Sequence, residues 1–251
     1  MLLPEPDRGA GSTEHPRGVV WYAQKVTWLA VLFLTVSLGA RALPTGHGPF
    51  ANQHEFAVAF SWGILLAYVW FEFRYRVRML GLLVLPVALA MLLYADTVDA
   101  QVQPLVPALQ NNLLLTLHVA TAVVSYGAAA VAFAAAVMYL VHPKVRWSGM
   151  PDRDLLDEIG YRAAVVANQL MTVMIILGAI WAEIAWGRYW SWDPKETAAL
   201  VTWLIYGAYL HARVARDWRG DRAAWLLILG FAAVLFTYFG NLFFGGLHSY
   251  A

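Results

Sequence analysis

The chain has 251 residues, of which 61% are hydrophobic and only 13% are charged. Soluble globular domains carry roughly 25% charged residues, so this composition excludes a soluble globular protein and indicates a membrane protein with several spans. The net charge of +1 gives no reason to expect a nucleic-acid partner. Cysteine is absent, which excludes a disulfide framework, a thiolate metal site and a role as a thiol substrate.

The chain is expected to begin with a tail and to continue as one membrane domain. Residues 1–20 are polar, rich in Gly and Pro, and lack the apolar core of a signal peptide, so we predict a disordered cytoplasmic tail. Residues 21–251 contain no repeat of about 20–50 residues and no separable soluble segment. We therefore predict a single transmembrane domain over residues 21–251.

Apolar runs that approach or exceed the length needed to cross a hydrocarbon core, about 20 residues, predict about seven membrane-spanning helices. We place them at Val26–Leu43, Glu55–Phe73, Met79–Tyr94, Leu113–Val141, Ala163–Trp186, Glu196–Ala212 and Ala223–Phe244. The third run is short. The charged stretch Gly149–Leu156, between the fourth and fifth runs, is predicted to be a loop on the inner side.

The basic residues divide unevenly between the two sides of the membrane that seven spans define. Cytoplasmic loops carry an excess of Lys and Arg. With the N-terminus inside, 14 of the 17 basic residues fall on the inner side, and only Arg41, Arg188 and Lys195 fall outside. The predicted fold class is therefore an all-α polytopic transmembrane bundle, with its N-terminus inside and its C-terminus outside.

The outer segment 181–197, between the fifth and sixth spans, is rich in aromatic residues. Four tryptophans and one tyrosine occur within 12 consecutive residues. Because Trp and Tyr collect at membrane interfaces in general, an aromatic belt is one interpretation. Their concentration in a single loop favours instead a flat apolar platform for a planar ligand. Its members would be Trp186, Tyr189, Trp190 and Trp192.

The next residues have the pattern of a helix N-terminus. Asp193 as N-cap, Pro194 at the first helical position and Glu196 at the third form a capping box, which would start the sixth helix. The same helix end, together with Arg188 and Lys195, presents positive charge and favours an anionic group such as a haem propionate. The two roles are compatible.

Three histidines are candidate iron ligands, because imidazole is a standard axial ligand of haem and a histidine in a span tends to mark function. The topology puts His118 and His248 on the same side as the aromatic loop; each is interpreted as a ligand or as a polar packing residue. His211 lies 16 residues after Lys195, roughly 24 Å along a helix. By itself it is interpreted as an interfacial histidine at the inner boundary. No ligand role is expected for His15, His47, His54 and His142.

Several separated motifs resemble one family of haem-handling membrane proteins. Residues 186–197 resemble the tryptophan-rich WWD signature, and the stretches 106–119, 202–213 and 246–250 match further motifs in the same order. Together, over about residues 104–251, they resemble the CcsA/ResC-type cytochrome c biogenesis protein, often labelled CcsB in bacteria.

The resemblance implies a function in cytochrome c synthesis. A protein of this type pairs with a ResB/CcsB-type membrane partner, accepts haem b from inside, and presents it at the outer face to the CXXCH motif of apocytochrome c. Haem lyase activity would require that partner. A thiol-reducing thioredoxin-like protein is a further expected partner, and the protein would contact membrane lipid. Its location would be the cell membrane, or the thylakoid membrane in a photosynthetic organism.

The resemblance also assigns roles to residues. It makes His118 and His248 the outer iron ligands, and it makes His211 a transmembrane haem ligand instead of an interfacial histidine. The predicted haem-binding set is His118, His248, His211, Trp186, Tyr189, Trp190, Trp192 and Asp193. No residue is expected to act as a general acid or base. Two alternatives stay open: a WWD protein that delivers haem to a chaperone, and a haem-free membrane transporter.

Overall fold

The structure is a computed structural model that describes residues 18–45, 47–101, 112–145 and 149–248. Within these residues the chain forms seven α-helices and two short 3-10 helices, as the predicted all-α class requires. The α-helices are α1 (Val19–Thr45), α2 (Gln53–Tyr75), α3 (Gly81–Thr97), α4 (Asn112–Val141), α5 (Arg153–Trp186), α6 (Pro194–Arg216) and α7 (Asp221–Phe239). The 3-10 helices are η1 (Arg78–Leu80) and η3 (Gly240–Leu242).

Several helix ends differ from the predicted ones. Helix α5 begins at Arg153, so the second half of the stretch predicted as a loop, Gly149–Leu156, is helical. Helix α1 begins at Val19, inside the predicted tail, whose residues 1–17 lie outside the described part of the chain. Helix α7 ends at Phe239, five residues before the predicted end of its span. Hydropathy marks apolar runs and not helices, so it misses the polar first turns of α5 and includes the apolar residues Leu242–Phe244, which follow α7.

Six of the seven helices are long and apolar enough to cross a membrane, judged by length and composition. Helix α6 is the exception, although its 23 residues correspond to about 35 Å, enough for a bilayer core. It carries Lys195 and Glu196 in its first turn and Arg213 and Arg216 in its last. The charges of α6 therefore lie at its ends, and its centre is apolar.

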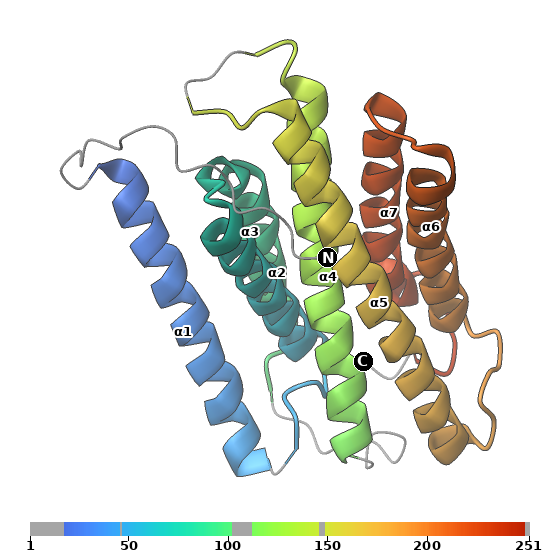
Figure 1. Cartoon of the computed structure of the whole chain (residues 1–251). Helices are drawn as coiled ribbons and strands as arrows, with labels where there is room; N and C mark the ends of the chain where they lie inside the picture. The colour runs from blue at the N-terminus through green and yellow to red at the C-terminus, as the bar shows by residue number, and fades with distance from the viewer. Residues whose placement is uncertain (1–17, 46, 102–111, 146–148, 249–251) are drawn as a thin grey trace.

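The helices run roughly side by side, as Figure 1 shows. Helices α4 and α5 pack along each other, α2 packs on α3 and α4, and α7 packs on α4 and α6. Helix α1 packs mainly on α2 and leaves large apolar side chains exposed, among them Leu32, Phe33 and Val36. An exposed apolar helix face of this kind suits contact with lipid.

Small residues allow α2 and α4 to approach each other closely. A Cβ on Gly127 would lie 2.2 Å from the carbonyl oxygen of Gly63, and a Cβ on Gly63 would lie 2.4 Å from the carbonyl oxygen of Val123. Only glycine fits at these two positions, because the obstructing atoms belong to the backbone. Close approach through small residues is typical of helix packing in membranes. The crossing fixes α2 against the helix that carries His118.

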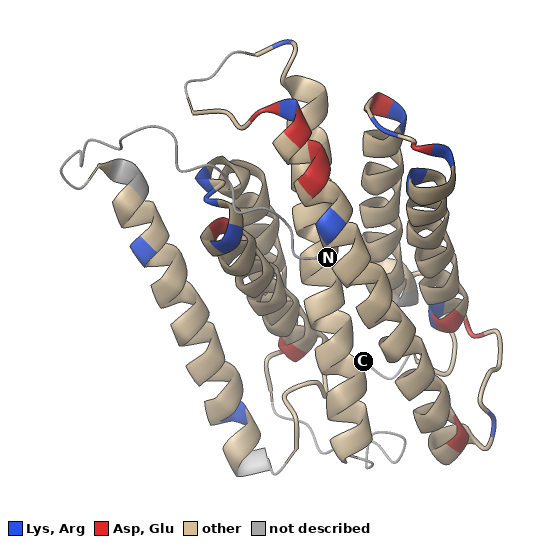
Figure 2. Ribbon diagram, in the orientation of Figure 1, with Lys and Arg blue, Asp and Glu red and all other residues tan. Residues whose placement is uncertain are grey.

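Charged residues gather toward the two ends of the bundle and leave its middle largely apolar (Figure 2). The end where α5 finishes and α6 begins, called the cavity end below, carries Arg41, Arg188 and Lys195. The opposite end carries the larger group of basic residues, as the predicted topology requires. The direction of the chain across a membrane remains a prediction.

Candidate functional site

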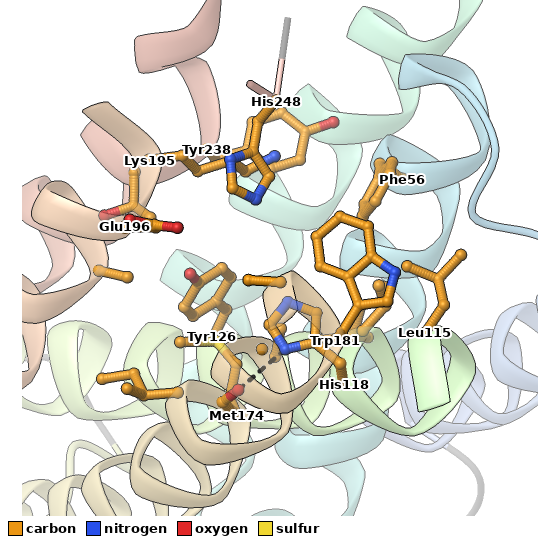
Figure 3. A pocket seen from close by; sticks show the side chains of 18 of the residues that line it. Phe56, Leu115, His118, Tyr126, Met174, Trp181, Lys195, Glu196, Tyr238 and His248 are labelled. Atoms are coloured by element: carbon orange, nitrogen blue, oxygen red, sulfur yellow. Dashed lines mark hydrogen bonds between the residues drawn. The ribbon is translucent and has the colours of Figure 1, made fainter. Parts of the chain in front are cut away.

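A cavity of about 140 Å³ lies at the cavity end of the bundle, with walls from α2 to α7 and from the segment after α7. His118 of α4 and His248, beyond α7, both line it. In Figure 3 the two imidazole rings approach the cavity from opposite sides, with Trp181 beside them. The structure therefore brings to one cavity the two histidines that the sequence assigned to one face of the membrane.

The ring of His118 is held by α5. Its Nδ1 lies 2.8 Å from the backbone carbonyl oxygen of Met174. A carbonyl can only accept, so Nδ1 carries the proton and donates, and the lone pair of the neutral ring is on Nε2. Gly178, one turn further along α5, leaves room for the ring: a Cβ there would lie 2.7 Å from His118 Cε1. Trp181 stacks on the same ring at 6.3 Å between centroids.

The ring of His248 is held by Asp193, the residue before α6. His248 Nδ1 lies 2.8 Å from Asp193 Oδ1, and the backbone N–H of Leu247 donates to Oδ2 at 2.6 Å. A carboxylate that accepts from one ring nitrogen orients the ring and fixes the lone pair on the other, as is common behind metal-binding histidines. Asp193 thus joins the segment after α7 to the start of α6.

The electrostatics around His248 favour its neutral form. Burial lowers the pKa of His248 to about 4, the positive charge of Lys195 adds to this, and Asp193 opposes it. Burial raises the pKa of Asp193, but the hydrogen bond from the Lys195 backbone and the contact with His248 outweigh burial and hold it below its usual value. At neutral pH His248 is therefore an uncharged imidazole, the form that binds iron.

The predicted capping box is confirmed. Asp193 Oδ1 accepts from the backbone N–H of Lys195 at 3.0 Å, and Glu196 Oε2 accepts from the backbone N–H of Asp193 at 3.2 Å. Glu196 Oε2 also accepts from the backbone N–H of Ser191 at 2.8 Å. The start of α6 and the end of the aromatic loop are therefore held in one hydrogen-bonded turn.

The aromatic residues of the loop lie at the cavity end of the bundle, but they do not form one flat surface. Tyr189 and Trp190 line the cavity. Trp186 lies edge to face with His248, with centroids 4.9 Å apart and rings at 75°. Trp192 is 69% exposed and meets Trp190 at 89°. The rings are thus inclined to one another, and of the four only Tyr189 and Trp190 belong to the cavity wall.

The other described histidines, which are His47, His54, His142 and His211, do not line the cavity. His211 is exposed on α6, near the opposite end of that helix. The Nδ1–H of His54 donates to the backbone carbonyl of Ala95 at 2.9 Å, and His47 Nδ1 lies 2.8 Å from the carbonyl oxygen of Gly48. His15 lies outside the described residues.

The two imidazoles of His118 and His248 suit a metal ion that already carries other ligands. In the described ranges of the chain, no group of three or more His, Asp or Glu side chains is placed to hold a metal ion. Two imidazoles alone would hold a bare ion weakly, whereas a porphyrin supplies four nitrogens and needs only axial ligands. An apolar cavity between two neutral histidines therefore fits haem better than a free cation.

The sequence analysis did not identify which residues of α5 position His118, although it counted Trp181 among the aromatic residues of the outer segment. Met174, Gly178 and Trp181 supply the carbonyl acceptor, the space and the stacked ring. Their spacing of four and three residues puts them on one helix face, which is a signal the sequence contains. Nothing in the sequence says that this face meets His118.

The fold and the site together define a helical membrane protein with two histidines at one aromatic-walled cavity. Residues 50–248 match the model of the family described as "Cytochrome C assembly protein". The chain is 35% identical to the "Cytochrome c biogenesis protein CcsA" of Guillardia theta, over 93% of this chain and 87% of that protein. It is 34% identical to the protein of that name from Gloeobacter violaceus, over 88% of this chain and 84% of the relative.

The CcsA of Synechococcus elongatus is similar at 35% identity, over 88% of this chain and 85% of its own length. The chain belongs to the cytochrome c assembly protein family. The family resemblance that the motifs indicated is thereby confirmed, and the chain is a multi-pass membrane protein of cytochrome c biogenesis.

Proposed function

We propose that this chain is the haem-handling subunit of a cytochrome c synthase. It would accept haem b from the inner side, hold it at the outer face between His118 and His248, and present it to the CXXCH motif of apocytochrome c. The observation that carries the proposal is the pair of Nδ1 hydrogen bonds, one to Met174 and one to Asp193. They set the same tautomer in both rings and support axial ligation through Nε2 on both faces of a porphyrin.

The addition of the substrate thiols to the haem vinyl groups depends more on how the porphyrin is positioned than on acid–base catalysis by this chain. Each substrate thiol adds its S–H across one vinyl C=C bond, so that a C–S bond forms and the hydrogen ends on the other vinyl carbon. No net oxidation occurs, and both atoms of the S–H bond are retained in the product. This chain would contribute by fixing the porphyrin between two rings, with inclined tryptophans on one side, so that the vinyl edge meets the thiols.

His211 would serve haem entry. It is exposed on the bundle surface, far along α6 from the cavity. A histidine there supports a haem site completed by a ligand from the ResB-type partner. Substrate thiols would be kept reduced by a thioredoxin-like protein. The location would be the cell membrane, or the thylakoid membrane in a photosynthetic source.

Replacement of either cavity histidine tests the proposal. The chain, purified with its partner, is expected to carry six-coordinate low-spin haem. His118→Ala and His248→Ala should each lose most of it, and added imidazole should restore part of the spectrum by filling the vacated axial position. His54→Ala is the matched control, because His54 also donates to a backbone carbonyl but lies away from the cavity lining.

Three outcomes would contradict the proposal. Wild-type haem content and spectra in both variants would mean that the iron is held elsewhere. A colourless wild-type complex would favour the haem-free transporter. If the haem-loaded chain transferred its haem to a chaperone and not to apocytochrome c, this would favour the alternative of a WWD protein that delivers haem to a chaperone.

A further inference from the structure

Lys195, the second residue of α6, is the one cationic side chain among the described residues that line the cavity, and Glu196 beside it is the one carboxylate. Its side chain lines the cavity together with His118 and His248, and Figure 3 shows it on the same side as His248. Its ammonium nitrogen lies 5.3 Å from the centre of the Phe56 ring. Among the described residues, no carboxylate lies within ion-pair distance of this nitrogen.

The two nearest carboxylates in sequence are already used. Asp193 accepts from the Lys195 and Leu247 backbone and from His248. Glu196 accepts from the backbone of Ser191 and Asp193. A cation in a cavity of low polarity without a counter-ion is costly. Neither carboxylate lies within ion-pair distance of the ammonium group, so Lys195 has no counter-ion among the described residues.

Trp190 supplies a second donor to the same cavity wall. Its indole Nε1–H is buried and has no hydrogen-bond acceptor in the described part of the chain. An indole nitrogen can only donate. Two donors that line one cavity, one of them charged, call for an acceptor that carries negative charge, and a carboxylate is the simplest such group.

We propose that Lys195, assisted by the indole N–H of Trp190, binds one propionate of the haem and thereby sets the direction in which the porphyrin lies. The inference rests on the proposed function, since it concerns how that substrate is held. The vinyl groups of haem b lie on the edge opposite the propionates. A propionate at Lys195 therefore turns the vinyl edge away from the start of α6, so Lys195 is a positioning residue for the thiol addition.

The test compares haemin with its dimethyl ester, which has the same ring but no carboxylate. The full chain, purified in detergent with its partner and depleted of haem, is titrated with each compound and followed by the low-spin absorbance. Lys195→Met, which removes the charge but keeps much of the volume, should weaken haemin binding roughly 10–100-fold, as expected for a charged hydrogen bond. It should leave the affinity for the ester unchanged. Trp190→Phe should show a smaller loss, also confined to haemin.

Lys144→Met is the matched control, because it makes the same substitution at an exposed lysine that follows α4 and does not line the cavity. It should bind both compounds as the wild type does. If Lys195→Met weakens haemin and the ester equally, or changes neither, the propionate contact is wrong. If the wild type binds neither compound, the proposed function itself fails, and that result is distinct from a failure of the Lys195 assignment.

Discussion

Asp193 serves two structures with one carboxylate. It caps α6 through the backbone N–H of Lys195, and it holds the segment after α7 through His248 Nδ1 and the backbone N–H of Leu247. Three donors share two oxygens, and the side chain is only 6% exposed. The position of His248 therefore depends on a charged acceptor at the start of another helix.

Asp193→Asn separates these two roles. Asparagine is as good an N-cap as aspartate, so the start of α6 should form as before. Its amide has one acceptor oxygen for three donors and no charge, so the hold on His248 should weaken. We expect haem affinity to fall roughly 10–100-fold, the usual effect of losing a carboxylate behind a metal-binding histidine, with protein yield unchanged. Haem titration checks this, and wild-type affinity would show that Asp193 acts only as a cap.

The site could be predicted in part from the sequence. Because successive loops alternate between the two sides of the membrane, the number of spans was enough to predict that His118 and His248 lie on the same side. The hydrogen bond between Asp193 and His248 joins residues 55 positions apart, and it depends on how the segment after α7 folds back. Neither periodicity nor composition encodes that path. The same holds for the carbonyl of Met174, since any residue type could supply it.

At the scale of the helices, the sequence predicted the apolar centres well and the polar ends poorly. The segment from Asp152 to Glu158, at the start of α5, is as rich in charged residues as a loop would be. Leu156 and Ile159 are nevertheless buried there. Arg153 donates to Asp221, at the start of α7, at 2.7 Å. Tertiary contacts therefore extend α5 beyond its apolar run, and hydropathy carries no information on such contacts.

The ion pair between Arg213 of α6 and Asp157 of α5 should be the main charged contact that stabilises this end of the bundle. The two side chains meet through both guanidinium Nη atoms, with Nη1 at 2.7 Å from Oδ1, and they are only 7% and 14% exposed. Asp157→Asn would leave the arginine charge buried and unpaired, at a cost of about 3 kcal/mol or more. The thermal unfolding midpoint in detergent should fall by roughly 6–12 °C.

The control for that prediction is Asp217→Asn. Asp217 pairs with Arg219 at 2.9 Å, but both side chains are about 70–80% exposed, and exposed pairs contribute about 0–1 kcal/mol. Its backbone is left-handed, with φ of 47°, a conformation that asparagine also tolerates. The midpoint should therefore move by no more than about 3 °C. An equal fall in both variants would mean that burial does not decide the strength of these pairs.

At the scale of the whole molecule, the direction of α6 decides the topology. If α6 crosses the membrane, the cavity with His118 and His248 faces one side and the basic group at the other helix ends faces the opposite side. Its charged residues lie in its first and last turns, where they reach the polar boundary of a bilayer. The uneven distribution of Lys and Arg then places the cavity outside.

Because the chain has no cysteine, single introduced cysteines can report the side on which each end of α6 lies. Arg188 precedes α6 and Arg219 follows it, and both are exposed. In intact cells a membrane-impermeant maleimide should label Arg188→Cys, whereas Arg219→Cys should react only after permeabilisation. The reverse pattern, with Arg219→Cys labelled in intact cells and Arg188→Cys only after permeabilisation, would mean that the start of α6, where Asp193 holds His248, lies inside. His248 would then face the cytoplasm, and the cavity could not meet an exported apocytochrome. The orientation of α6 therefore decides whether the cavity can present haem to that substrate.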